Sequence, residues 1–108
     1  MVRLIVDSGS TKTDWCFATP DGKFVRINTS GINPAVQAPD IIEGILNNEL
    51  LPSLTTQAIN RNDVGEIYYY GAGCTPDRQS IMRNMLIRTF SSSKTIEVNS
   101  DLLAAARA

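Results

Sequence analysis

The sequence predicts an α/β fold: a mixed five-stranded sheet with helices on both faces, in the order β-β-β-α-β-α-β-α. Short runs of alternating apolar and polar residues, separated by turn residues, fill the first 30 positions. From residue 40 onward, apolar residues at helical spacing alternate with short β-branched and aromatic runs. Antiparallel strands followed by parallel strand–helix units together give a mixed sheet.

Three antiparallel strands are expected first, at residues 2–6, 13–18 and 24–27. Asp7 ends the first strand, and a polar turn over residues 8–12 leads into the second. The second and third are joined by Pro20-Asp21-Gly22, in which Pro presets φ and Gly accepts a positive φ. This opening therefore reads as a three-stranded meander.

The first helix is expected to start at Asp40, because Asp40 and Glu43 resemble a capping box, with Pro39 just before it. Apolar residues then recur at helical spacing as far as residue 58. Pro52 lies inside this stripe and lacks a backbone N–H, so we expect a kink or break near residues 50–51.

A fourth strand is expected at residues 66–70, and a second helix with Thr75 as its N-cap and Pro76 at its first position. A fifth strand follows at residues 95–98, and residues 99–101 cap a third helix that starts at Leu102. The sequence ends at Ala108 inside this Ala-rich stretch without a helix stop signal. We therefore expect a partial chain.

Composition narrows the function classes. The 108 residues carry 10 Lys and Arg against 11 Asp and Glu, so nucleic acid is not expected as a partner. The longest clearly apolar run is residues 102–106, far below the roughly 18 residues that a membrane span needs.

The chain has no histidine, which excludes His-based catalysis within it. Cys16 and Cys74 form no metal-type pair, in keeping with a reducing, cytoplasmic setting.

The most informative segment is the turn after the first strand, residues 7–14, which read Asp-Ser-Gly-Ser-Thr-Lys-Thr-Asp. Backbone N–H groups around Gly9 can form an anion-binding concavity, to which hydroxyl groups and Lys12 add donors and charge. Asp7 can hold Mg²⁺ through water. The spacing differs from a Walker A loop, and a polar hairpin with a surface lysine remains the alternative.

These residues resemble the first phosphate motif of the actin-like and sugar-kinase superfamily, and within it the N-acetylglucosamine kinase and BadF/BadG/BcrA/BcrD-type ATPase family. Three further segments fall in the order that the family shows: residues 29–34, 70–74 and 98–108. The resemblance covers nearly the whole chain. It implies a ribonuclease H-like, actin-like ATPase lobe over residues 1–108, with a second lobe absent from this sequence.

The resemblance also implies roles for individual residues. ATP phosphates would be bound by Gly9, Ser10, Thr11, Lys12 and Thr13, and Asp7 would place Mg²⁺. The substrate would be held by Asn33, with Gly73 beside it, and Asp101 would be the general base in phosphoryl transfer.

Each of the last three residues has a simpler interpretation, which stays open. Asn33 precedes a proline and suits a turn, and Gly73 suits tight strand-to-helix geometry. Asp101 in the first turn of a helix complements the helix dipole.

The resemblance implies ATP-dependent phosphorylation of an amino sugar, N-acetylglucosamine in particular, by a cytoplasmic parent protein. The expected partners are the sugar and the second lobe, with a homodimer left open, and residues 1–108 alone are expected to be inactive. One alternative is an ATPase that activates a partner dehydratase or reductase. Another is a non-catalytic fragment.

Overall fold

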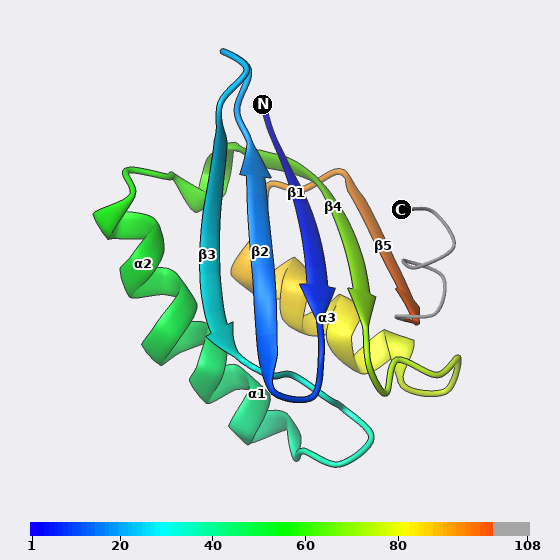
Figure 1. Ribbon diagram of the computed structural model, residues 1–108. Coiled ribbons are helices and arrows are strands. Elements are labelled where there is room, and N and C mark those ends of the chain that lie inside the picture. The colour runs from blue at the N-terminus through cyan, green and yellow to red at the C-terminus, as the bar shows by residue number, and fades with distance from the viewer. Residues whose placement is uncertain (101–108) are drawn as a thin grey trace.

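The computed structural model describes residues 1–100, which form a mixed five-stranded sheet with the strand order β3-β2-β1-β4-β5 (Figure 1). β1 pairs antiparallel with β2 and parallel with β4; β2 pairs antiparallel with β3, and β4 parallel with β5. The predicted α/β class with a mixed sheet is confirmed. The strands are β1 (Val2–Ser8), β2 (Lys12–Ala18), β3 (Phe24–Ser30), β4 (Val64–Gly71) and β5 (Thr95–Ser100).

The hairpin between β2 and β3 closes as predicted. The Thr19 N–H donates to the Lys23 carbonyl at 2.9 Å, and the Gly22 N–H donates to the Thr19 carbonyl at 3.1 Å. Gly22 has a φ of 88°, a conformation that glycine adopts without a steric penalty. The turn sets the register that pairs Asp14 with Asn28.

The first helical segment runs from residue 39 to residue 56 in three parts: α1 (Pro39–Ile45), the π-helical η1 (Leu46–Leu50) and α2 (Leu51–Thr56). The predicted interruption before Pro52 is present as the π segment, but the chain keeps helical dihedral angles through it. The predicted capping box is wrong. Ala38 is the N-cap, and it makes no side-chain capping bond. Pro39 occupies the first turn, where its fixed φ suits a helix and no N–H is needed.

The second helix, α3 (Gln79–Thr89), starts later than predicted. The Thr75 hydroxyl donates to the Asp77 carboxylate at 2.5 Å instead of capping a helix. The Thr75 carbonyl accepts from the N–H groups of Arg78 and Gln79, which forms a turn before α3. A short 3₁₀ turn, η2 (Arg61–Asp63), precedes β4.

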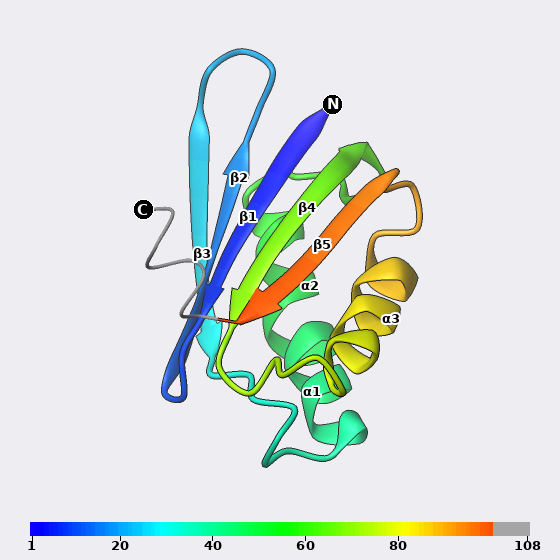
Figure 2. The ribbon, with the colours of Figure 1, turned by 90° about the vertical axis from the view of Figure 1, so that its right-hand side faces the viewer.

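All of the helices within residues 1–100 lie against one face of the sheet, which leaves its other face open (Figure 2). The burial pattern of β1, strictly alternating along its seven residues, reflects this arrangement. The helix predicted from Leu102, which the expectation of helices on both faces includes, lies outside the described residues. The core between sheet and helices includes Leu4, Val6, Trp15, Phe17, Leu46, Leu50, Ile67, Met82, Leu86 and Phe90.

Within residues 1–100, no helix has the length and apolar character that crossing a membrane requires.

Candidate functional site

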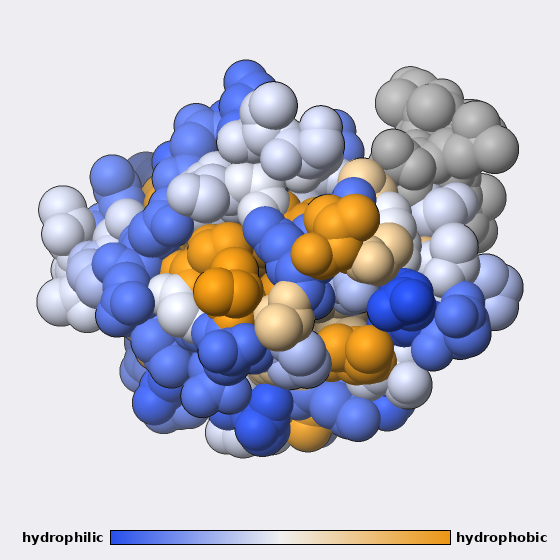
Figure 3. Space-filling view, turned by 90° about the horizontal axis from the view of Figure 1, so that it is seen from below, coloured by the Kyte–Doolittle hydropathy of each residue, from blue (hydrophilic) through white to orange (hydrophobic). Residues whose placement is uncertain are grey.

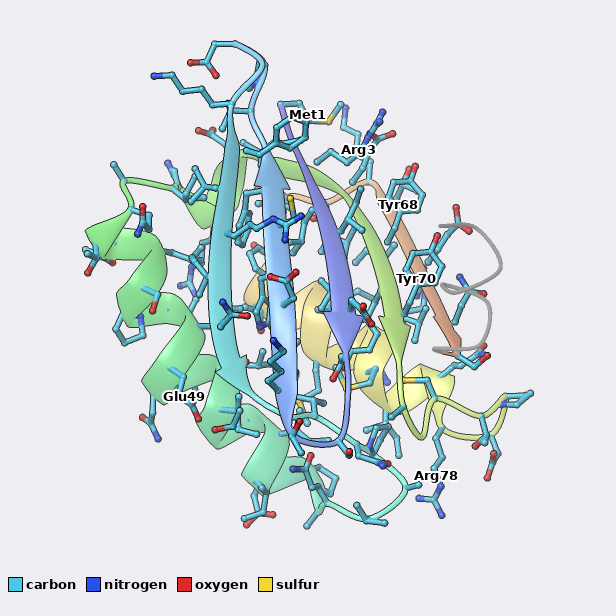
Figure 4. The ribbon with its side chains drawn as sticks, in the orientation of Figure 1. Met1, Arg3, Glu49, Tyr68, Tyr70 and Arg78 are labelled. Atoms are coloured by element: carbon cyan, nitrogen blue, oxygen red, sulfur yellow. The ribbon has the colours of Figure 1, made fainter. Side chains whose placement is uncertain are left out.

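An open pocket of about 460 Å³ lies beside the turn between β1 and β2. Figure 4 looks onto the open face of the sheet, from which Arg3, Tyr68 and Tyr70 also project. The pocket combines two carboxylates, two cationic side chains and an amide, so it suits a ligand with both anionic and cationic parts. Its lining residues are Asp7, Gly9, Thr11, Lys12, Asp14, Arg26 and Asn28.

Strand register explains why these side chains converge. Asp7 pairs with Asp14 across β1 and β2, and Asp14 pairs with Asn28 across β2 and β3. Residues that pair directly across neighbouring strands project from the same face. The same row continues to Tyr70 on β4 and Asn99 on β5. A polar row therefore crosses the whole sheet on its open face.

The charges in the pocket are partly paired. Arg26 Nη1 lies 3.5 Å from Asp14 Oδ2, with 70% of the Arg26 side chain exposed, so this ion pair is weak. No such bridge is found for Asp7 within residues 1–100. The two carboxylates fit Mg²⁺, which takes one or two protein carboxylates and fills its other positions with water and phosphate oxygens. No cluster of three or more metal-ligating side chains occurs in that range.

The turn itself is tight and mostly exposed. The Gly9 N–H donates to the Lys12 carbonyl at 2.9 Å, which closes the turn. Ser10, Thr11 and Lys12 are exposed around it, as expected for residues that meet a ligand. The turn that is predicted to bind phosphate therefore lies in an open and polar part of the surface.

Thr13 differs from the other residues predicted to bind phosphate. It is fully buried on the helix-covered face of the sheet and does not line the pocket. Its hydroxyl lies 2.9 Å from Ser8 Oγ and 3.1 Å from the Ser30 carbonyl oxygen. Strand alternation is the reason, because Lys12 and Asp14 on either side of Thr13 take the open face. Its side chain supports the turn from beneath.

The two residues predicted to hold the substrate are in direct contact. Gly73 has a φ of 73°, and a Cβ atom there would lie 2.8 Å from Asn33 Cγ. Only a residue without a side chain leaves room for the Asn33 amide at this position. Asn33 also makes a turn, since its Oδ1 accepts from the Ala35 N–H at 2.9 Å and its N–H donates to Gln37 Oε1 at 2.7 Å. The turn interpretation of Asn33 is therefore confirmed, and its substrate contact stays a prediction.

The loop after β3, which carries Asn33, and the loop after β4, which carries Gly73, meet at one edge of the sheet. This is the edge where β1, β3, β4 and β5 end. The Ala72 N–H donates to the Ser8 carbonyl at 2.9 Å, and Arg78 Nη1 donates to the Pro34 carbonyl at 3.1 Å. Seen from this end, hydrophobic patches lie among hydrophilic residues (Figure 3). Asp101, the predicted general base, lies outside the described residues; Ser100 before it pairs with Gly71 at the end of β4.

Sequence reasoning missed four residues around the site: Ser8, Arg26, Asn28 and Glu49. Arg26 and Asn28 could have been found, because the hairpin turn fixes the β2–β3 register. Glu49 accepts hydrogen bonds from the Ser30 N–H at 2.8 Å and from the Ser30 hydroxyl, and so ties η1 to the end of β3 (Figure 4). No local pattern links Glu49 to Ser30, 19 residues away.

A buried tyrosine lies next to Ser8. Burial raises the pKa of the Tyr69 hydroxyl, and the nearby Ser8 side chain lowers it by a smaller amount. The hydroxyl is close to Ser8 but is not in hydrogen-bond geometry with any residue in the described part of the chain. Its ring meets Trp15 edge-on, with a centroid separation of 6.4 Å. Tyr69 is therefore a core residue that keeps its proton.

Comparison with known proteins finds a likeness among solved structures. No protein-family model and no curated protein matches the chain. A crystal structure from Porphyromonas gingivalis, described as a "Putative N-acetylglucosamine Kinase", is similar with a TM-score of 0.85 and 43% sequence identity. The match covers 96% of this chain and 36% of that one, so the chain spans about a third of the P. gingivalis protein. This likeness supports the predicted α/β fold and is consistent with a lobe of the sugar-kinase or actin-like type.

Proposed function

We propose that the chain is the N-terminal lobe of an ATP-dependent sugar kinase that phosphorylates N-acetylglucosamine or a close amino sugar. The observation that carries this proposal is the likeness to the P. gingivalis protein, at 43% identity over nearly the whole of this chain. The pocket beside the β1–β2 turn supports it, because the charged side chain of Lys12 and the hydroxyl group of Thr11, which both line it, are suited to phosphate.

In this proposal the turn holds the nucleotide phosphates. Gly9 lets the backbone approach them closely, Ser10 and Thr11 offer donors, and Lys12 contributes a positive charge. Asp7 would hold Mg²⁺, and the bound ion would supply charge neutralisation on the phosphates. Asp14 pairs with Asp7 across β1 and β2 and lies 3.5 Å from Arg26, so its charge at this site is partly offset.

The sugar would lie near the contact between Asn33 and Gly73, where the loop after β3 meets the loop after β4. Asn33 carries both donor and acceptor groups, which suits a sugar hydroxyl. Asp101 would accept the proton of the attacking hydroxyl, and its position after β5 supports this role because β5 ends beside β4. A second lobe would close over the hydrophobic and polar surface of this edge, so residues 1–108 alone are expected to show negligible turnover.

The activity test uses the complete protein that carries these residues. It is mixed with ATP, Mg²⁺ and a panel of hexoses and amino sugars, and sugar phosphates are detected by mass spectrometry. We expect phosphorylated N-acetylglucosamine, and we expect it to vanish in Asp101→Asn. ATP hydrolysis without any sugar phosphate would contradict the proposal and favour an activator ATPase.

The phosphate turn has its own test in Lys12→Ala. Loss of a charged donor to phosphate is expected to raise the KM for ATP about tenfold or more, since hydrogen bonds to charged groups contribute about 1.5–3 kcal/mol. Lys23→Ala is the matched control, because Lys23 lies on the far hairpin with its side chain 79% exposed. Equal effects of the two substitutions on KM would argue against a phosphate site at this turn.

A further inference from the structure

Three loops pack against one another at the edge of the sheet where the site lies. They are the turn at residues 9–12, the segment at residues 31–38 and the loop at residues 71–74. The first two meet backbone to backbone, because a Cβ atom at Gly31 would lie 2.7 Å from the Gly9 carbonyl oxygen and would overlap the Ser10 carbonyl. The second and third meet where Gly73 accommodates Asn33. These contacts leave little room for any of the three loops to move alone.

The side chain of Ser8 joins the first two loops from within the core. Ser8 is fully buried, and its hydroxyl donates to the Ile32 carbonyl at 2.9 Å and accepts from the Ile32 N–H at 3.2 Å. Its remaining acceptor position faces the Thr13 hydroxyl at 2.9 Å. One hydroxyl has a single donor and two acceptor positions, so Ser8 is fully used.

The hydrogen bonds of Ser8 matter because Ser8 and its partner Ile32 each lie next to a residue that is proposed to bind a ligand. It immediately precedes Gly9 in the turn proposed to hold phosphate, and Ile32 immediately precedes Asn33, proposed to hold the sugar. The Ser8 carbonyl also accepts from Ala72, next to Gly73. A buried hydrogen-bonded group resists displacement, because breaking its bonds leaves polar atoms without partners.

We propose that Ser8 is a positioning residue that couples the phosphate-binding turn to the sugar-binding segment, so that binding of either ligand strengthens binding of the other. This inference rests on the proposed function. The physical basis is shared ordering: a ligand that fixes residues 31–37 also fixes residues 9–12 through Ser8, and the second ligand then has less disorder to remove. Such coupling is reciprocal, and each ligand typically changes the affinity for the other by about 5- to 150-fold.

Hydrogen–deuterium exchange on the complete protein tests the coupling directly. N-acetylglucosamine is added alone, and protection of the amides at residues 9–12 and 31–37 is compared with the free protein. ADP affinity is measured with and without the sugar. In the wild-type protein we expect protection of both segments and an increase in ADP affinity of about tenfold. In Ser8→Ala we expect the sugar to protect residues 31–37 alone and the increase to shrink to about twofold or less.

The matched control is Ser93→Ala. The Ser93 hydroxyl also donates to a backbone carbonyl, that of Val64 at 2.8 Å, but at the opposite end of the sheet. This control loses a similar bond and is expected to keep the full coupling. If Ser8→Ala does not fold, two other variants are expected to reduce the coupling partially. Ser8→Cys keeps the branching of the side chain but has a larger and weaker donor, and Thr13→Val removes one of the partners of Ser8.

The outcomes separate the two proposals. Protection of residues 31–37 by sugar with no effect at residues 9–12 in the wild-type protein would overturn the coupling and leave the sugar site standing. Equal coupling in the wild-type protein and Ser8→Ala would overturn the role of Ser8. Absence of any protection by N-acetylglucosamine would overturn the proposed function and this inference with it.

Discussion

Ala58 is the one non-glycine residue with a positive φ within residues 1–100, and its φ of 58° lies where residues with a Cβ atom are uncommon. It follows α2, and the hydrogen bonds around it form a Schellman motif: the Ile59 N–H donates to the Leu54 carbonyl at 2.9 Å and the Ala58 N–H to the Thr55 carbonyl at 3.2 Å. The motif requires a left-handed residue at this position, and glycine is the usual choice.

Ala58→Gly is therefore expected to stabilise the protein by about 0.5–1 kcal/mol, because it removes the Cβ penalty at the position where glycine is preferred. Urea denaturation measures the change in the free energy of unfolding. Ala18→Gly in β2, where φ is not positive, is the control and is expected to destabilise instead. A loss of stability in Ala58→Gly would argue against the left-handed conformation.

Tyr69 makes stability depend on pH in the alkaline range. Burial raises its pKa in the folded state, whereas the unfolded chain has a tyrosine pKa near 10. The stabilisation is complete below pH ~10 and is lost as the pH rises toward the folded-state pKa, by about 1.4 kcal/mol per pH unit.

Tyr69→Phe removes the titrating group and is expected to reduce this alkaline loss. Because the Tyr69 hydroxyl has no hydrogen-bond partner within residues 1–100, the change should cost little stability at neutral pH. Urea denaturation at pH 9 and pH 11 measures the difference, and Tyr68→Phe, which keeps Tyr69, should retain the loss. An unchanged slope in Tyr69→Phe would count against the buried tyrosine as its source.

At the scale of the element, the long helical segment shows why a π turn precedes Pro52. The buried residues Ile42, Leu46, Leu50 and Leu54 are spaced by four, whereas an α-helix has 3.6 residues per turn. Side chains that are spaced by four residues move gradually around the surface of an α-helix. A π turn holds more residues than an α turn, and so it brings these side chains back to one face. The Leu51 N–H bonds to the Leu46 carbonyl in the π pattern just before the residue that lacks an N–H.

This segment is also fixed to the sheet by Glu49, whose carboxylate accepts from the backbone N–H and hydroxyl of Ser30. Glu49→Ala is expected to lower the free energy of unfolding by about 1–2 kcal/mol, because bonds to a charged acceptor are lost. Glu43→Ala on the same segment is the control. It removes only an exposed ion pair with Arg88 at 3.6 Å, and about 0.5 kcal/mol or less is expected from urea denaturation. Equal losses in the free energy of unfolding for the two variants would mean that the hydrogen bonds between Glu49 and Ser30 do not stabilise the protein.

At the scale of the whole molecule, the two faces of the sheet carry different kinds of side chain. The helix-covered face holds the core, and the open face carries the polar row from Asn28 through Asp7 to Asn99. The turn after β1 and the loops after β3 and β4 gather at one edge of the sheet, so the pocket and the Asn33 contact lie at the same end of the molecule. This arrangement suits a ligand that reaches from the turn at residues 9–12 to Asn33.

Packing between loops at this edge is tested by Gly31→Ala. The new Cβ would meet backbone atoms of Gly9 and Ser10, which cannot rotate away, so a destabilisation of about 1–3 kcal/mol is expected. Gly44→Ala is the matched control. Its Cβ would lie 3.8 Å from the nearest atom, inside α1, and is expected to stabilise by about 0.5–1 kcal/mol. Thermal unfolding of both variants measures the contrast, and similar melting temperatures would contradict the close contact.

Much of the fold follows from local patterns. The alternation in residues 2–30 and the Pro20-Asp21-Gly22 turn predict the meander, and Pro52 predicts the interruption of the first helix. Predictions of helix starts were weaker, because Asp40 and Thr75 have capping chemistry but the chain places Pro39 and Gln79 at the first helical positions. For the site, the turn at residues 9–12 was found from composition, whereas Arg26 and Asn28 required the register.

Local patterns along the chain are sufficient to predict the order of the elements, the two faces of each strand and the polar turn after β1, because these depend on backbone geometry within a few neighbouring residues. Contacts between distant residues depend on the folded structure instead: Ser8 bonds to Ile32, 24 residues away, Gly31 packs on Ser10, and Gly73 makes room for Asn33. Those contacts arise when sheet register and helix packing bring separate loops to one edge. No periodicity along the chain encodes such a meeting.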